Sequence, residues 1–139
     1  MLSLIYVSRP LVDPEARARV LDDIQAVSIA RNTDLGITGL LISTSGYFAQ
    51  ILEGPESGVE AVMARIAVDP RHHEVRIIRR SDVSERRFPH WRMARFDGES
   101  FGAVRVNPLL ADCHARGDAD AIARFERLID VIAIGGPLS

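Results

Sequence analysis

The sequence predicts an α+β fold of the ferredoxin-like type, a five-stranded mixed sheet built in the order βαββαββ with two helices on one face. Up to about residue 97, short β-rich runs alternate with segments of helical apolar spacing. Two of the β-rich runs are joined by a tight turn, which indicates a hairpin. Residues 98–139 carry two helical patterns instead. We therefore divide the chain into a sheet domain, residues 1–97, and a C-terminal helical extension, residues 98–139, packed on the other face of the sheet.

The first strand and the first helix have clear signals. Residues 2–7 are apolar at nearly every position, which is typical of a strand covered on both faces. Asp13-Pro14-Glu15 predicts a helix start, because it combines a capping aspartate, a proline in the first turn and an acid near the positive end of the helix. Apolar residues at helical spacing then continue to about Asn32.

A hairpin and a second helix follow. The strands are expected at residues 37–43 and 47–53, on either side of the turn Thr44-Ser45-Gly46. Gly54-Pro55-Glu56 predicts the start of a helix that Asp69-Pro70 ends.

Two strands and two helices complete the pattern. Strands are expected at residues 74–80 and 90–96, with Trp91 and Met93 alternating onto one face of the second. Asn107-Pro108 predicts the start of a short helix, and Asp118 caps a longer one. The longer helix carries an apolar stripe of Ile122, Phe125, Ile129 and Ile132. Because the first and third strands are apolar on both sides, we expect these helices to cover the second face of the sheet.

Composition restricts the classes of function. The chain has 139 residues, of which 47% are hydrophobic and 26% charged, as in an ordinary globular domain. Its formal net charge of −2 argues against a nucleic-acid partner, and no apolar run is long enough to cross a bilayer. The N-terminal run lacks the basic leader of a signal peptide, and the single cysteine, Cys113, cannot form an internal disulfide. Because of the missing leader and the single cysteine, we expect a cytoplasmic protein. The histidines do not have the spacing of metal ligands.

Three polar side chains, Asn32, Thr38 and Gln50, stand where sheet packing alone does not need them. Gln50 lies in the apolar run of residues 47–52, where a carboxamide requires a hydrogen-bond partner. Each residue alone has a structural explanation: a buried amide bonded to a neighbour, or a residue at a helix end. Together they mark the place to look for a ligand.

A series of short motifs runs through the chain: Leu4-Ile5-Tyr6-Val7-Ser8, Arg31-Asn32, Ile37-Thr38-Gly39-Leu40-Leu41, Phe48-Ala49-Gln50-Ile51-Leu52-Glu53-Gly54-Pro55, Asp69-Pro70-Arg71-His72, Arg87-Phe88 and Trp91-Arg92-Met93. In this order and spacing, across about residues 1 to 96, they resemble the BLUF family, the blue-light sensors that bind flavin. The chain is similar to the short members, which carry no fused enzymatic domain.

The resemblance implies that the isoalloxazine ring of a flavin lies between the first two helices. Tyr6 would donate an electron and a proton to the excited flavin, and the hydrogen bonds of Gln50 would rearrange. Asn32 would hold the pyrimidine edge of the ring, and Trp91 and Met93 would carry the signal. The residues implied to bind the cofactor are Tyr6, Ser28, Arg31, Asn32, Gln50, Asp69, Arg71 and His72.

The implied function is that of a blue-light photoreceptor and not of an enzyme. Its noncovalent cofactor would be FAD, with FMN and riboflavin as alternatives. A red-shifted state would signal to a downstream protein partner, and the resemblance leaves a homodimer open. One other hypothesis is a small acyl- or phosphoryl-transfer enzyme with an anion site of Arg and Asn, which would be colourless. Another is a flavin enzyme using NAD(P)H, but the chain lacks a glycine-rich dinucleotide loop.

Overall fold

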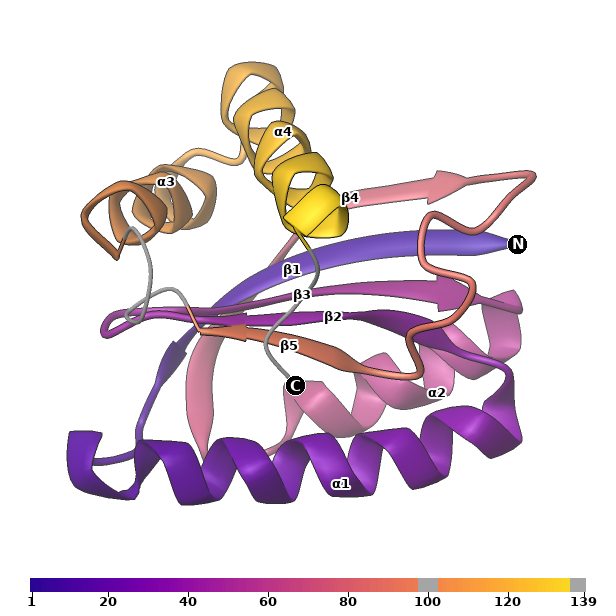
Figure 1. Cartoon of the computed structure of the whole chain (residues 1–139), viewed down its shortest axis with the longest axis horizontal. Helices are drawn as coiled ribbons and strands as arrows, with labels where there is room; N and C mark the ends of the chain where they lie inside the picture. Colours follow the sequence, from indigo (N-terminus) through magenta and orange to yellow (C-terminus); the bar gives the residue numbers. More distant parts are fainter. Residues whose placement is uncertain (98–102, 136–139) are drawn as a thin grey trace.

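The computed structural model describes residues 1–97 and 103–135 and shows one sheet between two layers of helices (Figure 1). The strands are β1 (Leu2–Pro10), β2 (Thr38–Ser43), β3 (Phe48–Gly54), β4 (His72–Asp82) and β5 (Ala94–Asp97). They lie in the order β4-β1-β3-β2-β5, and each neighbouring pair is antiparallel except β2 and β5, which are parallel. The five-stranded mixed sheet of the predicted ferredoxin-like fold is confirmed.

Helices cover both faces of this sheet. A short 3₁₀ turn, η1 (Pro14–Ala16), leads into α1 (Arg17–Leu35), and the other helices are α2 (Glu56–Ala67), α3 (Ala103–Ala115) and α4 (Ala119–Gly135). Helices α1 and α2 lie on one face, and α3 and α4 lie on the other (Figure 1). In the described ranges, no helix combines the length and the apolar character needed to cross a membrane.

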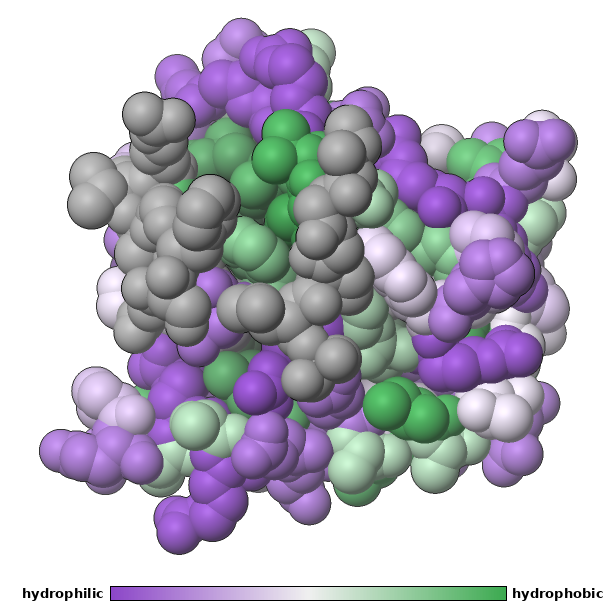
Figure 2. Space-filling view, in the orientation of Figure 1, coloured by the Kyte–Doolittle hydropathy of each residue, from purple (hydrophilic) through white to green (hydrophobic). Residues whose placement is uncertain are grey.

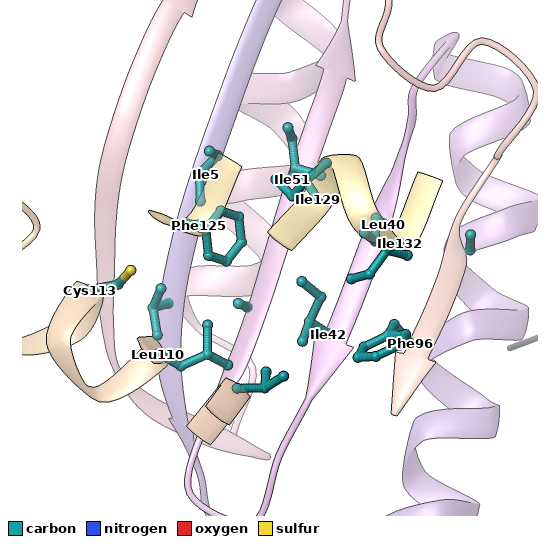
Figure 3. Close-up of a cluster of buried hydrophobic side chains, with 14 of the residues drawn as sticks. Ile5, Leu40, Ile42, Ile51, Phe96, Leu110, Cys113, Phe125, Ile129 and Ile132 are labelled. Carbon is teal, nitrogen blue, oxygen red and sulfur yellow. The ribbon is translucent and has the colours of Figure 1, made fainter. Parts of the chain in front are cut away.

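Side chains alternate across the sheet and form two separate cores. On the α1–α2 side, Leu4 and Tyr6 of β1 are buried with residues of both helices. On the α3–α4 side, Ile5 of β1 is buried in one core with Phe125 and Ile129 of α4, and Figure 3 shows Phe125 near Ile5 and Ile129 near Ile51. This second core confirms that the C-terminal helices cover the face of the sheet opposite α1 and α2.

The apolar stripe of α4 faces the sheet, and the exposed side of the helix carries the charged Arg127 and Asp130 beside the exposed Val131. In Figure 2, purple residues cover the top of the molecule over α4, and green residues lie beneath them. Phe125, Ile129 and Ile132 are buried as predicted. Ile122 is only partly buried, and Ala121 takes the innermost position of the first turn.

The end of α1 places Asn32 beside the sheet. Gly36 adopts a left-handed conformation with φ of 69°, which a residue with a side chain rarely tolerates, and its N–H bonds to the Asn32 carbonyl. The N–H of Ile37 bonds to the same carbonyl at 2.9 Å. The helix therefore ends at Leu35, three residues later than predicted, and Asn32 lies in its last turn with its side chain completely buried.

The predicted strand at residues 90–96 is wrong in its first half. Strand β5 begins only at Ala94, because the backbone before it turns, with the N–H of Trp91 bonded to the Phe88 carbonyl. Residues two apart in a turn do not share a face, so Trp91 and Met93 point to opposite sides. Met93 is buried in the α1–α2 core, whereas Trp91 packs against the α3–α4 core.

The predicted start of α3 at Asn107-Pro108 is also wrong. The helix begins at Ala103, and Pro108 lies inside it. The Asn107 side chain does not cap the helix, because its oxygen accepts the Thr44 hydroxyl at 2.7 Å and the Gly46 N–H at 3.1 Å. Asn107 therefore joins α3 to the turn between β2 and β3.

The arginines of β4 attach this edge strand to helices on both faces. Arg76 donates to the last carbonyls of α3, and Arg79 forms an ion pair with Glu126 of α4. Arg80 turns the other way and pairs with Glu56 and Glu60 of α2. Strand alternation explains why neighbouring arginines reach opposite layers.

Candidate functional site

An open pocket lies between the sheet and the α1–α2 layer. Its empty volume, open solvent at the mouth included, is about 590 Å³. Strands β1 and β3 supply its floor, and the two helices and the chain after α2 supply its walls. It is lined by Tyr6, Ile24, Val27, Ser28, Arg31, Leu41, Phe48, Gln50, Arg65, Ile66, Asp69, Arg71 and His72.

Tyr6 and Gln50 meet in the floor of the pocket because they are direct partners in the register of β1 and β3. The Tyr6 hydroxyl donates to Gln50 Oε1 at 2.6 Å. Since that oxygen faces Tyr6, the amide nitrogen points away from it and lies 3.1 Å from the sulfur of Met93. The sequence showed that Gln50 needed a buried partner, and the structure identifies two.

The phenol of Tyr6 is held in its neutral form. Burial raises the pKa of Tyr6 well above its ordinary value, the negative charge of Asp69 raises it further, and Arg31 acts in the opposite direction. Its exposed fraction is 3%. A neutral, buried phenol can donate its one hydrogen bond, and here it donates that bond to Gln50.

Asn32 has a fully buried side chain, and its Oδ1 acceptor has no hydrogen-bond partner among the described residues. Its amide nitrogen donates to the carbonyl of Arg92 at 2.8 Å. Within the described part of the chain, Asn32 Oδ1 is buried and has no hydrogen-bond partner. An unpaired buried acceptor is unfavourable by about 1–3 kcal/mol, so this oxygen is suited to an N–H donor from a ligand.

Positive charge gathers on the helix walls of the pocket. Burial lowers the pKa of Arg31, and the nearby charge of Arg65 lowers it further. The buried Nε of Arg31 has no hydrogen-bond partner among the described residues. Two arginines that repel each other beside an open pocket favour an anionic group between them.

At the mouth of the pocket, Asp69 and Arg71 form a bidentate ion pair whose shortest N–O distance is 2.6 Å. The hydrogen bond from Arg71 lowers the pKa of Asp69. Next to this pair, His72 Nδ1 lies 2.7 Å from the Ser8 hydroxyl, and its Nε2 lies 2.6 Å from the Ile66 carbonyl. A carbonyl only accepts, so Nε2 of neutral His72 carries the hydrogen and the Ser8 hydroxyl donates to Nδ1.

The residues implied to bind a cofactor come together in space. All of them line the pocket except Asn32, which is buried in the same turn of α1 as Arg31. Several lining residues were missed, namely Ile24, Val27, Leu41, Phe48, Arg65 and Ile66. Ile24 and Val27 carried a signal, since both belong to the apolar stripe of α1, yet Val27 remains 51% exposed because it faces the pocket. Nothing in the local pattern distinguished Arg65.

Comparison with known proteins identifies the family. A family model described as "Sensors of blue-light using FAD" matches residues 1–94. The chain belongs to the BLUF family. It is therefore a member of a family of blue-light sensors that use a flavin.

Relatives share this domain within larger proteins. The chain is 29% identical over 90 residues to the alpha subunit of a photoactivated adenylate cyclase from Euglena gracilis, and the match covers 65% of the chain and 9% of that protein. It is 29% identical over 97 residues to the blue light- and temperature-regulated antirepressor BluF of Escherichia coli, and the match covers 70% of the chain and 24% of that protein. The chain thus spans about a tenth of the length of the cyclase subunit.

The fold matches solved BLUF structures along nearly the whole chain. The dark-state structure of BlrB, a BLUF protein, aligns with a TM-score of 0.73 and 31% identity, covering 92% of this chain and 93% of that one. The photo-activated state of BlsA aligns with a TM-score of 0.79 and covers 99% of this chain, but at 23% identity it supports the fold alone.

The pocket of this BLUF chain fits a flavin. A flavin ring needs a flat apolar slot with hydrogen-bonding groups at one edge. Leu41, Phe48 and the α1 side chains supply the apolar surface, and Gln50 lies in the floor. The unpaired oxygen of Asn32 and the arginines beside the pocket match the imide edge and the anionic tail of a flavin nucleotide.

Proposed function

We propose that the chain is a blue-light photoreceptor that holds FAD noncovalently in the pocket between the sheet and the α1–α2 layer. The observation that carries this proposal is the buried hydrogen bond from Tyr6 to Gln50 in the pocket floor. It combines an oxidisable phenol with an amide that can reverse its donor and acceptor ends. A binding pocket without photochemistry does not need the Tyr6 phenol and the Gln50 amide paired in its floor.

Residues at three depths of the pocket would hold the cofactor. Asn32 would accept the ring N–H with its unpaired Oδ1, and Gln50 would contact the neighbouring carbonyl edge. Ser28 and Arg31 of α1 would bind further out. Asp69, Arg71 and His72, which line the pocket, would lie beside the ribityl and phosphate groups. FMN and riboflavin, which share the flavin ring, are the alternatives to FAD.

Bound flavin would supply absorption of blue light and, once excited, an acceptor for one electron and one proton. Tyr6 would supply both, the proton leaving from its phenol oxygen. While Tyr6 is oxidised and deprotonated, its hydroxyl no longer donates to Gln50, so the constraint that holds the amide orientation is removed. The Gln50 side chain would then rotate or tautomerise, and its rearranged hydrogen bonds would persist after the electron and proton return to Tyr6.

Met93 would detect the change in Gln50. In the present orientation the Gln50 amide nitrogen contacts the Met93 sulfur, and a reversed amide would present its oxygen there instead. The Met93 carbonyl accepts a hydrogen bond from Gln25 of α1, and the next residue begins β5. Movement at Met93 would therefore reach both α1 and the edge of the sheet, and Trp91 would transmit it to the α3–α4 layer.

The output would pass to a downstream protein partner, and we propose no reaction catalysed by this chain itself. In this proposal residues 1–97 sense light, and residues 98–139 respond to the change in the sheet against which α3 and α4 pack. A homodimer is compatible with the proposal.

An absorption spectrum of the purified protein tests the proposal directly. We expect a flavin spectrum whose visible bands shift to the red under blue light and return in the dark. Acid or heat denaturation should release the flavin, because the only cysteine, Cys113, lies in the other core and cannot form an adduct. A colourless protein that does not take up added FAD, or a flavin that stays attached to the denatured chain, would contradict the proposal.

A further inference from the structure

A buried carboxylate at the far end of β3 has no role in the pocket. Glu53 is 2% exposed and lies on the sheet face opposite Gln50. Its Oε2 accepts the N–H of Arg87 at 2.7 Å, and its Oε1 accepts the N–H of Phe88 at 2.8 Å. Burying a carboxylate is unfavourable unless hydrogen bonds compensate for lost water, so both bonds are needed to keep Glu53 in place.

A second set of bonds holds the same segment of chain. Thr38 of β2 lies 3.4 Å from Glu53 Oε1 and accepts a hydrogen bond from Arg86 at 2.9 Å. The guanidinium of Arg86 also donates to the carbonyls of Glu53 and Gly36. Arg86 therefore lies partly buried against the ends of β2 and β3. Residues 86–88 are fixed to β2, β3 and the end of α1.

The fixed residues lie immediately before the two proposed signalling residues. The ring of Phe88 stacks on Trp91, with centroids 5.0 Å apart and planes 8° from parallel. The Trp91 carbonyl accepts the N–H of Gly39 at 2.8 Å. Two residues later the Met93 sulfur reaches Gln50. The segment from Phe88 to Met93 is thus attached to the sheet by a ring stack and by hydrogen bonds on both of its faces.

We propose that Glu53 is a positioning residue, whose carboxylate fixes Arg87 and Phe88 so that Trp91 packs toward the α3–α4 layer and Met93 reaches Gln50. The placement of Trp91 and Met93 follows from the hydrogen bonds of the structure, and the relevance of that placement to light sensing rests on the proposed function. Without the carboxylate, two backbone N–H groups lose their acceptors and the segment is free to rearrange.

The substitution Glu53→Gln tests this with little change of shape. One end of a carboxamide can accept an N–H, but the other end presents its own N–H groups to the backbone, so one of the two bonds is lost. Hydrogen exchange at the Arg87 and Phe88 amides should become about ten- to a hundredfold faster, as expected for loss of a bond to a charged group. Asn107→Ala is the matched control, because it removes hydrogen bonds to Thr44 and Gly46 at the turn between β2 and β3, the opposite end of the hairpin from Glu53.

Two signals report the positions of the side chains and need no photochemistry. Trp91 is the only tryptophan, so the protein's tryptophan fluorescence and its quenching by acrylamide report whether Trp91 remains stacked on Phe88. Met93 is one of three methionines, and its methyl resonance should shift while that of Met63, in α2, stays. Met93→Leu assigns the resonance. We expect stronger quenching of Trp91 and a displaced Met93 signal in Glu53→Gln, and neither change in Asn107→Ala.

Unchanged exchange, quenching and Met93 resonance in Glu53→Gln would overturn the proposal, as would equal changes in both variants. If Glu53→Gln does not fold, Glu53→Asp decides by the same criteria, since it keeps the charge but shortens its reach to Arg87 and Phe88. All measurements are made on the whole chain in the dark. A failure of the proposed function would appear separately, as a wild-type protein without a light-induced red shift.

Discussion

At the scale of single residues, the hydrogen bond between Tyr6 and Gln50 determines both chemistry and stability. Each residue satisfies the other at a site where Tyr6 is only 3% and Gln50 only 4% exposed. Removing either side chain alone leaves a buried polar group without a partner, whereas removing both does not. Mutations at this pair therefore affect light sensing by removing the oxidisable phenol or the amide. They affect folding by leaving a buried polar group without a hydrogen-bond partner.

Tyr6→Phe should bind flavin but give no normal red-shifted product. The phenyl ring keeps the packing of the pocket floor, and only the oxidisable hydroxyl is lost. A light-minus-dark difference spectrum measures the effect. Tyr47→Phe is the control, since Tyr47 lies against the α3–α4 core. A full shift at normal yield in Tyr6→Phe would remove Tyr6 from its proposed role.

Gln50→Leu should bind flavin and lose the red shift completely. Leucine is close in volume, so flavin affinity should fall by only about 0.5–1.5 kcal/mol, the value of one neutral hydrogen bond. The free energy of unfolding should fall by about 1–3 kcal/mol, because the Tyr6 hydroxyl loses its acceptor. Urea denaturation measures this loss.

The loss should be smaller when Gln50→Leu is introduced into Tyr6→Phe, where no hydroxyl is left unpaired. Equal losses in both backgrounds would mean that the Tyr6–Gln50 bond does not contribute to stability. A wild-type-like, long-lived red shift in Gln50→Leu would refute the proposed switch.

Tyr6 should also make stability depend on alkaline pH. Its pKa is raised in the folded chain above the ordinary value of 10.0, so the unfolded chain releases this proton first. Stability from Tyr6 is fully present below pH 10 and falls as pH rises toward the folded pKa, by about 1.4 kcal/mol per pH unit. Tyr6→Phe should lose less stability than wild type above pH 10 in a urea series. Parallel curves for the two proteins would show that Tyr6 is not the group responsible.

At the scale of elements, the sheet separates two cores with different tasks. The face toward α1 and α2 keeps an open pocket with buried polar groups, whereas the face toward α3 and α4 is closed by apolar side chains (Figure 3). A change in the closed core should therefore lower stability without altering the chemistry of the pocket.

Phe125→Ala tests this separation. The Phe125 side chain has an exposed fraction of 0%, so its truncation should lower the free energy of unfolding by about 3–5 kcal/mol. The dark flavin spectrum should stay the same, because the residue lies across the sheet from Gln50. Ile122→Ala, at a partly buried position of the same helix, should be much milder. A displaced dark spectrum in Phe125→Ala would show that the two cores are not independent.

At the scale of the whole molecule, an open pocket between helices and sheet makes stability depend on the cofactor. A ligand that binds only the folded chain adds about 2.7 kcal/mol when its free concentration is a hundred times Kd. For a chain of this size, that corresponds to several degrees in Tm.

Removing the flavin should therefore lower Tm by several degrees, and adding FAD back should restore it in a concentration-dependent way. Calorimetry in the dark measures both. Adenosine diphosphate is a useful control, since it shares the anionic tail of FAD but cannot fill the apolar slot. Identical Tm values with and without FAD would mean that the pocket does not bind it.

The sequence by itself determined the features that depend on residues close together in the chain, namely the strands, the helix stripes and the motifs. The apolar residues 2–7 predicted a strand covered on both faces, and in the structure Ile5 and Tyr6 lie in opposite cores. The apolar run around Gln50 predicted that its amide has a buried partner, which is Tyr6. The helix stripe predicted a covered second face. These inferences succeed because strand and helix periods are local properties of the backbone. The motif pattern also led to the BLUF family, which the family model confirms.

Only the tertiary structure decided how segments far apart in the chain satisfy one another. Glu53 fixes residues 86–88, Asn107 reaches the hairpin turn instead of capping its helix, and Trp91 and Met93 take opposite sides. No local pattern contains these outcomes, because a buried polar group bonds to whichever partner the folded chain brings within about 3 Å. The strand period predicts faces only where the backbone is extended, and before β5 it is not.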